Sequence, residues 1–150
     1  LKKKKFKKDI LKIKGAFPGI RVWHKTIQDE LIEKGSLVTP LGRRRHFWDR
    51  LKDASTLRAA IAFVPQSTIG DLLNLGLWRV YKELQTEGVE ILGQVHDAIL
   101  GQCDKDKLDD LMPKVLEKMH NPLEVNGRTM LIPSSVEVGD NWKDMETWTI

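Results

Sequence analysis

Apolar residues recur every three or four positions in two stretches of the chain. One stretch covers residues 20–31 and is followed by Gly35, which predicts a helix that ends at this glycine. The other covers residues 108–119, and Pro113 within it predicts a kink or break in a second helix. The apolar positions are Ile20, Trp23, Ile27 and Leu31 in the first stretch and Leu108, Leu111, Val115 and Met119 in the second.

A longer apolar stretch, residues 57–87, contains a proline at position 65. Pro65 disfavours helical backbone at the residue before it, and Thr68 and Asp71 have the spacing of a capping box. We therefore expect the helix to break at Pro65 and a new helix to run from about residue 67 to residue 87. The apolar positions of its core face are Ile69, Leu72, Leu73, Gly76, Leu77, Val80, Tyr81 and Leu84.

Two short apolar runs flank the pair His96-Asp97. The first run, residues 89–95, is rich in β-branched residues and too short for a typical helix, so it predicts a buried strand. The second, residues 99–103, predicts the hairpin partner of that strand. A carboxylate held at the turn between two strands is an oxygen ligand that a divalent cation can use. Aspartate is also an ordinary turn residue, so the pair by itself leaves both interpretations open.

A further hairpin is predicted near the end of the chain. Asn126-Gly127, placed between Val125 and Arg128, is a strong signal for a two-residue turn. Alternating apolar and polar residues over 128–138 predict two last strands. A mixed order of helices and antiparallel hairpins indicates an α+β fold.

Composition limits the class of protein. The 150 residues can bury the core of one domain. The single Cys103 excludes an internal disulfide and fits a reducing compartment. No apolar run approaches the 18 residues of a membrane span. We therefore expect a soluble intracellular protein with no membrane contact.

Positive charge is concentrated at the start of the chain. Residues 1–15 hold eight lysines and one aspartate, or +7, and because the whole chain carries +4, the other 135 residues carry about −3. Phe6, Ile10 and Ile13 predict a short basic amphipathic helix there. Two interpretations are equally favoured, contact with a phosphate backbone and a solvated helix face.

Five segments, taken in order along the chain, resemble the C-terminal part of family A, or DNA polymerase I-like, DNA polymerases. They are residues 17–20 (Phe-Pro-Gly-Ile), residues 38–45 with their Thr-x-x-Gly-Arg-Arg pattern, residues 58–71, the Val-His-Asp of residues 95–97, and residues 132–142. The resemblance implies an antiparallel palm sheet with packed helices. It implies that residues 1–50 form the last fingers helices and a basic hairpin, and that residues 51–150 form the palm. A bacterial or phage-infected cytoplasm is the implied location.

The resemblance also implies a mechanism and its residues. Family members transfer nucleotides onto a primer on a template using two Mg²⁺ ions and deoxynucleoside triphosphates. Asp97 would supply one metal ligand, and His96 would position the primer terminus. Arg58 and Gln66 would contact the duplex near its minor groove at the primer end. Minor-groove contacts of this kind test shape and pairing and not sequence.

Some family features differ or lie outside this chain. Many members carry Glu where this chain has Ala98, and Asn where it has Ala62. The first palm motif with the other metal-binding Asp is not in the chain, and neither is the fingers helix with its Lys and Tyr. The resemblance therefore implies that an upstream polymerase segment or subunit completes the site. The sheet would lack a strand of that segment, so an unpaired edge and an apolar patch are expected.

Two other functions remain open. Single-subunit RNA polymerases share the palm and a His-Asp motif, although residues 58–71 and the Val-Glu-Val-Gly ending are more similar to the DNA enzymes. The other alternative is a DNA-binding or assembly subunit without catalysis, although the presence of Asp97 argues against it.

Residues 43–45 form a second basic cluster, Arg-Arg-Arg. Because side chains alternate along a strand, one or two of these arginines are expected to reach DNA or a neighbouring segment. A salt-bridged surface hairpin is equally favoured.

Overall fold

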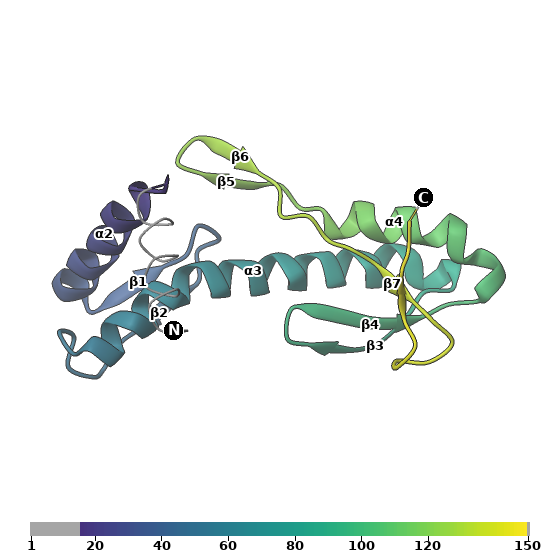
Figure 1. Ribbon diagram of the computed structural model, residues 1–150, viewed down its shortest axis with the longest axis horizontal. Coiled ribbons are helices and arrows are strands. Elements are labelled where there is room, and N and C mark those ends of the chain that lie inside the picture. The colour runs from purple at the N-terminus through teal and green to yellow at the C-terminus, as the bar shows by residue number, and fades with distance from the viewer. Residues whose placement is uncertain (1–15, 150) are drawn as a thin grey trace, which may run out of the picture. The chain divides into compact units, whose positions relative to one another are not determined.

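Helices and short antiparallel strand pairs follow one another along residues 16–149, the part of the chain that the computed structural model describes (Figure 1). These residues divide into two compact units at the bond between Ser67 and Thr68. Each unit has its own cluster of buried apolar side chains. The mixture of helices and antiparallel pairs confirms the predicted α+β class. The basic helix predicted within residues 1–15 lies outside the described residues.

The first unit is built from helix α2 (Gly19–Lys34), the strand pair β1 (Ser36–Val38) and β2 (Arg44–His46), and the first part of helix α3 (Ala54–Leu84). Helix α2 ends as predicted, because Gly35 adopts the left-handed conformation at φ 63° that glycine favours. Six buried side chains form the core of the unit. They are Ile27, Leu31, Leu37, Phe47, Ala60 and Phe63.

Helix α3 continues through Pro65, so the predicted break and capping box are wrong. A proline inside a helix removes one backbone hydrogen bond and costs about 3 kcal/mol. Burial of apolar side chains on both sides of the proline offsets this cost, since Phe63 packs in the first core and Leu72 and Leu73 are also buried. Tertiary packing therefore overrides the local preference. The helix ends at Leu84, three residues before the predicted end.

The second unit contains most of the strands. In chain order its elements are the rest of α3, a 3-10 turn η1 (Gln85–Glu87), β3 (Glu90–Val95), β4 (Ala98–Gln102), a 3-10 turn η2 (Lys105–Lys107), α4 (Leu108–Met119), β5 (Leu123–Val125), β6 (Arg128–Met130), β7 (Glu137–Val138) and β8 (Glu146–Thr147). The strands pair as β3-β4, β5-β6 and β7-β8. The core residues are Val80, Leu84, Val89, Leu111 and Met112.

Two predictions for the second unit have clear outcomes, and one strand is new. The hairpin around Asn126-Gly127 is confirmed, with both residues at positive φ (51° and 73°) as a two-residue turn requires. Helix α4 is confirmed and runs through Pro113 without a break. Strand β8 was not predicted, because its two residues give no periodic pattern.

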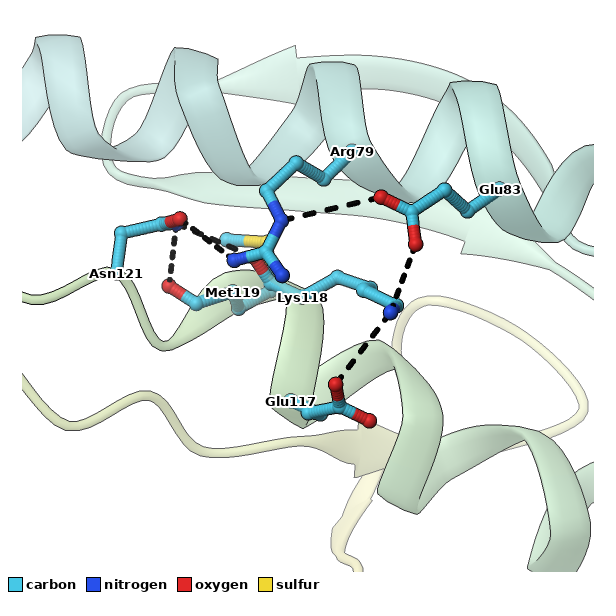
Figure 2. A network of polar contacts seen from close by, with 6 residues as sticks. All are labelled: Arg79, Glu83, Glu117, Lys118, Met119 and Asn121. Carbon is cyan, nitrogen blue, oxygen red and sulfur yellow. Dashed lines mark hydrogen bonds and ion pairs between the residues drawn. The ribbon is translucent and has the colours of Figure 1, made fainter.

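A polar network joins α3 to α4 (Figure 2). The guanidinium of Arg79 donates to Oδ1 of Asn121 at 2.8 Å, and Nζ of Lys118 lies 2.7 Å from Oε2 of Glu83. The Asn121 amide donates to two carbonyls at the end of α4. The hydrogen bond from Lys118 lowers the pKa of Glu83, and the same bond raises the pKa of Lys118, so both remain charged at neutral pH.

The two helices are also very close at Gly76. A Cβ atom built there would lie 2.7 Å from Sδ and 3.2 Å from Cα of Met119, so only glycine fits without a shift. Close packing and the polar network together hold α4 against α3 and support the β3-β4 hairpin in the same unit. Among residues 16–149, none of the helices combines the length and apolar character that crossing a membrane requires.

Candidate functional site

The His-Asp pair lies at the tip of the β3-β4 hairpin, as predicted. Val95 is paired with Ala98, so His96 and Asp97 are the two residues of the turn. Both side chains are exposed at this tip. The carboxylate of Asp97 therefore projects from a defined turn between two paired strands, where its oxygens are accessible to a cation.

The backbone at His96 has an unusual conformation. Its φ is 54°, in the left-handed region where a side chain is disfavoured and glycine is the usual residue. The β5-β6 hairpin of the same unit meets a similar demand with Asn126-Gly127. Glycine would adopt this conformation at lower cost, so His96 stands here at some conformational cost.

A hydrogen bond and apolar packing hold the other end of the hairpin in place. At the end away from the turn, Nε2 of Gln102 donates to Oε2 of Glu90 at 2.7 Å, across the paired positions of the two strands. The half-buried Ile91 and Cys103 pack on the second core. Burial raises the pKa of the Cys103 thiol, and the charge of Asp104 raises it further, so the thiol stays protonated at neutral pH.

The prediction that residues 89–95 form a buried strand is wrong as to burial. Strand β3 begins at Glu90, and two of its apolar side chains are largely exposed, Leu92 at 55% and Val95 at 42%. A register shift between Ile91 and Gly93 places Leu92 in a bulge. The apolar composition would suit a strand covered on both faces, whereas the part of the chain that is described covers only one.

An open groove of about 1310 Å³ lies within the second unit. Asp97 and the apolar residues Ile99 and Leu100 of the hairpin line it, together with Leu73 of α3 and Met119 of α4. The largely apolar lining and the two-stranded sheet agree with the predicted unpaired edge and apolar patch.

The described residues do not form a complete metal site. Within residues 16–149, no three or more His, Cys, Asp and Glu side chains gather in a way that could hold a metal ion. Asp97 is a fitting ligand by chemistry, because Mg²⁺ takes oxygen ligands and often uses only one or two carboxylates together with substrate phosphates. The described residues thus present one exposed carboxylate, and a metal site there would need further ligands.

The other two predicted site residues, Arg58 and Gln66, lie on helix α3 in the first unit. Both side chains are exposed. They are eight residues apart, or a little over two helical turns, so they project from neighbouring parts of the helix surface. His96 and Asp97 belong to the second unit.

The arginine hairpin shows the predicted alternation. The guanidinium of Arg44 donates to Oγ of Ser36 at 3.1 Å. The guanidinium of Arg45 lies over the ring of Phe47, 4.7 Å from its centroid, on the core side of the strand. Sequence reasoning missed the next feature, a stacked pair formed by His46 and Trp48. The available signal was two aromatic rings at positions i and i+2 where the strand ends, because side chains two residues apart on extended backbone share a face.

Comparison with known proteins identifies relatives. Residues 1–144 match the family model described as DNA polymerase family A. The chain is 32% identical over 136 residues to "DNA polymerase I, thermostable" of Thermus thermophilus, covering 85% of this chain and 16% of that protein. It is 31% identical over 134 residues to DNA polymerase I of Aquifex aeolicus, covering 84% of this chain and 21% of the relative. The chain thus spans about a fifth or less of these proteins.

A solved structure shares the fold. It is the "POL domain of Pol1 from M. smegmatis complex with DNA primer-template and dNTP", with a TM-score of 0.67 and 24% identity. The match covers 83% of this chain and 24% of that one.

Proposed function

The chain belongs to DNA polymerase family A, and on this premise we propose that it is the C-terminal fingers and palm portion of a template-directed DNA polymerase. The observation that carries the proposal is the His96-Asp97 turn, an exposed carboxylate held between paired strands inside the segment that matches the family. We assign residues 1–50 to the fingers and residues 51–150 to the palm. The proposed partners are primer-template DNA and deoxynucleoside triphosphates.

Mg²⁺ is general for the family, and Asp97 fits it as a hard oxygen ligand at a two-residue turn between paired strands. When bound, two such ions supply charge stabilisation at the attacking and leaving oxygens of the transferred phosphoryl group. Asp97 would hold one side of this site, and a carboxylate of an upstream segment would hold the other. Ala98 follows Asp97 where many members have Glu, so this chain would work without that auxiliary carboxylate.

His96 would hold the primer terminus in place. Its imidazole is kept at the turn in a conformation that glycine would adopt more easily, next to the proposed metal ligand. A hydrogen-bonding ring adjacent to Asp97 can orient the terminal nucleotide relative to that carboxylate. Positioning of this kind contributes to rate because less entropy is lost on reaching the transition state.

Arg58 and Gln66 would contact the duplex behind the primer terminus. Their exposed side chains project from α3, whose buried residues Ala60 and Phe63 fix the helix in the first core. Acceptors in the minor groove are nearly the same for every correct base pair, so these contacts would report mispairing. Ala62 stands where many members have Asn, so this chain would lack one of the duplex contacts that those members make.

An upstream polymerase segment, in the same or another chain, would supply the second metal-binding Asp and the fingers Lys and Tyr. The apolar groove and the unpaired sheet support this part of the proposal, since a strand from that segment would cover Leu92 and Val95. Without it, the exposed edge would be prone to pairing with other chains.

The test is a graft, in which this chain replaces the segment that it matches in DNA polymerase I of Aquifex aeolicus. We expect the grafted polymerase to extend a primer with deoxynucleotides in Mg²⁺ and to prefer them over ribonucleotides. A preference for ribonucleotides would favour the RNA polymerase alternative. A folded graft that binds primer-template and never extends it would favour a DNA-binding or assembly subunit.

Replacing Gln66 by Ala in the grafted polymerase should change how it treats a mismatched primer. Loss of a minor-groove contact should alter the ratio of mismatched to matched extension about tenfold, because one good contact to a base contributes roughly 1–3 kcal/mol of discrimination. The salt dependence of DNA binding should stay the same. Substituting several lysines of residues 2–14 is the matched control. If they contact phosphates, the slope of log affinity against log salt should flatten by about 0.9 per lost contact. An unchanged mismatch ratio for Gln66→Ala would contradict its role.

Replacing His96 by Gly separates the structural cost of this residue from its use. Glycine adopts a positive φ more easily than histidine does. The free energy of unfolding, measured in urea, should therefore stay the same or rise by up to about 1 kcal/mol. Primer extension by the grafted polymerase should nevertheless slow by at least tenfold. Equal activity with equal or greater stability would show that the imidazole has no role in positioning the primer.

A further inference from the structure

An exposed aromatic stack lies at the end of strand β2. The rings of His46 and Trp48 have centroids 5.6 Å apart and planes inclined by 21°, so they lie nearly parallel. Trp48 is 89% exposed, which is the highest value among the large hydrophobic residues within residues 16–149. An indole normally buries a large apolar area, and one that is left open on a folded unit is typical of a contact surface.

The local structure holds this stack in place. Phe47 lies between the two residues in sequence and is buried in the first core at 7% exposure. Phe47 also packs edge-on against Phe63 of α3, with ring centroids 6.2 Å apart. Because side chains alternate along an extended segment, anchoring Phe47 inward turns His46 and Trp48 outward.

Arg44 adds a positive charge to the row of outward-facing side chains that His46 and Trp48 belong to. Arg44 shares the outward face of the strand with His46, and its guanidinium is oriented by the 3.1 Å hydrogen bond to Ser36. That bond uses one of five N–H donors, so the others can meet an anion. Arg45 points to the other face, over the ring of Phe47, and is not part of this row.

The surrounding charge favours a polyanion. Residues 43–53 contain five Arg and Lys and two Asp, or +3, whereas residues 16–150 as a whole carry about −3. The hairpin is therefore a positive region on an otherwise acidic part of the chain. An acidic peptide would satisfy the cations, but a nucleic acid strand carries a flat base beside every phosphate and so suits both the cations and the indole.

We infer that Arg44, His46 and Trp48 form a binding site for single-stranded DNA, in which an unpaired base stacks on the indole of Trp48 and an adjoining phosphate meets Arg44. Proteins that bind single strands combine a basic path with aromatic platforms in this way, and the stacking tolerates any base. The inference uses the proposed function only for the presence of DNA. It concerns residues other than Arg58 and Gln66, which are proposed to contact the duplex.

The test measures binding of a fluorescently labelled oligothymidylate of about 12 nucleotides to the 150-residue chain by anisotropy. Trp48→Ala should weaken binding about tenfold, and Trp48→Phe, which keeps an aromatic face, should recover most of it. Trp142→Ala is the matched control, because Trp142 is also well exposed, at 64%, and belongs to the second unit. Its substitution should leave the affinity unchanged. Circular dichroism of each variant shows whether its fold is intact.

A salt titration separates stacking from charge. Trp48→Ala should shift the affinity without changing the slope of log affinity against log salt, and Arg44→Gln should lower that slope by about 0.7. Unchanged affinity in Trp48→Ala, an equal loss in Trp142→Ala, or equally tight Trp48-dependent binding of a duplex would overturn the inference. If the grafted polymerase extends primers while Trp48→Ala changes nothing, only this inference fails. A graft that never extends primers defeats the proposed function instead.

Discussion

Replacing Asp97 by Asn in the grafted polymerase is expected to lower the rate of single nucleotide addition about a thousandfold. The amide keeps the shape of the side chain and removes the negative charge that holds a metal ion. Metal ions contribute several kcal/mol to stabilising the transition state of phosphoryl transfer, and each 1.36 kcal/mol is a factor of ten in rate. Affinity for primer-template DNA should change little, because most of it comes from phosphate contacts elsewhere. Rapid-quench kinetics and anisotropy measure the two quantities.

Asp106→Asn provides the control for this loss. Asp106 is an exposed carboxylate of the same unit, in the 3-10 turn η2 and outside the hairpin. Removing its charge should leave nucleotide addition within about twofold of the unsubstituted graft. If Asp97→Asn had as small an effect as Asp106→Asn, Asp97 would be only a turn residue. The proposal that it holds a catalytic metal ion would then be wrong.

The chain by itself should show no primer extension. One carboxylate cannot hold two cations, and within residues 16–149 no cluster of three or more potential metal ligands is present to do so. Mg²⁺ dehydrates reluctantly and needs carboxylates and substrate phosphates arranged together, so half a site should bind it poorly. Gel analysis of extension by the purified chain, beside the grafted polymerase at the same concentration, measures the difference.

Contaminating polymerase is the main source of error in that comparison. A parallel preparation carrying Asp97→Asn should give the same background signal as the unsubstituted chain. Extension that the isolated chain supports and its Asp97→Asn form does not would show that the chain is catalytically complete, against the proposal.

The hairpin and its turn could be predicted from the sequence because their signals are local. Two short β-branched runs on either side of His96-Asp97 leave few alternatives to a hairpin. The helix that ends at Gly35 and the Asn126-Gly127 turn are local in the same sense, since each depends on a residue that tolerates positive φ. These signals specify local backbone geometry, and the turns that depend on them are confirmed.

The errors arise where distant contacts decide. Pro65 disfavours the helix locally, but packing of Phe63 and Leu72 on either side keeps α3 continuous. Strand β3 looks buried from its composition, and Leu92 is exposed because no further strand of the described chain covers it. The His46-Trp48 stack could not be predicted because it depends on which way the backbone turns the two side chains just after strand β2. Only the inward anchoring of Phe47 shows that the pair faces out.

The most direct test of the central claim, that Asp97 holds a catalytic cation, is equilibrium binding of Mn²⁺ in place of Mg²⁺. The sample is the grafted polymerase with primer-template and a non-hydrolysable deoxynucleotide, and the free ion is measured by electron paramagnetic resonance. We predict two bound ions for the unsubstituted graft and at least tenfold weaker binding of one of them in Asp97→Asn, with Asp106→Asn unchanged. Identical stoichiometry and affinity with and without the Asp97 carboxylate would contradict the claim.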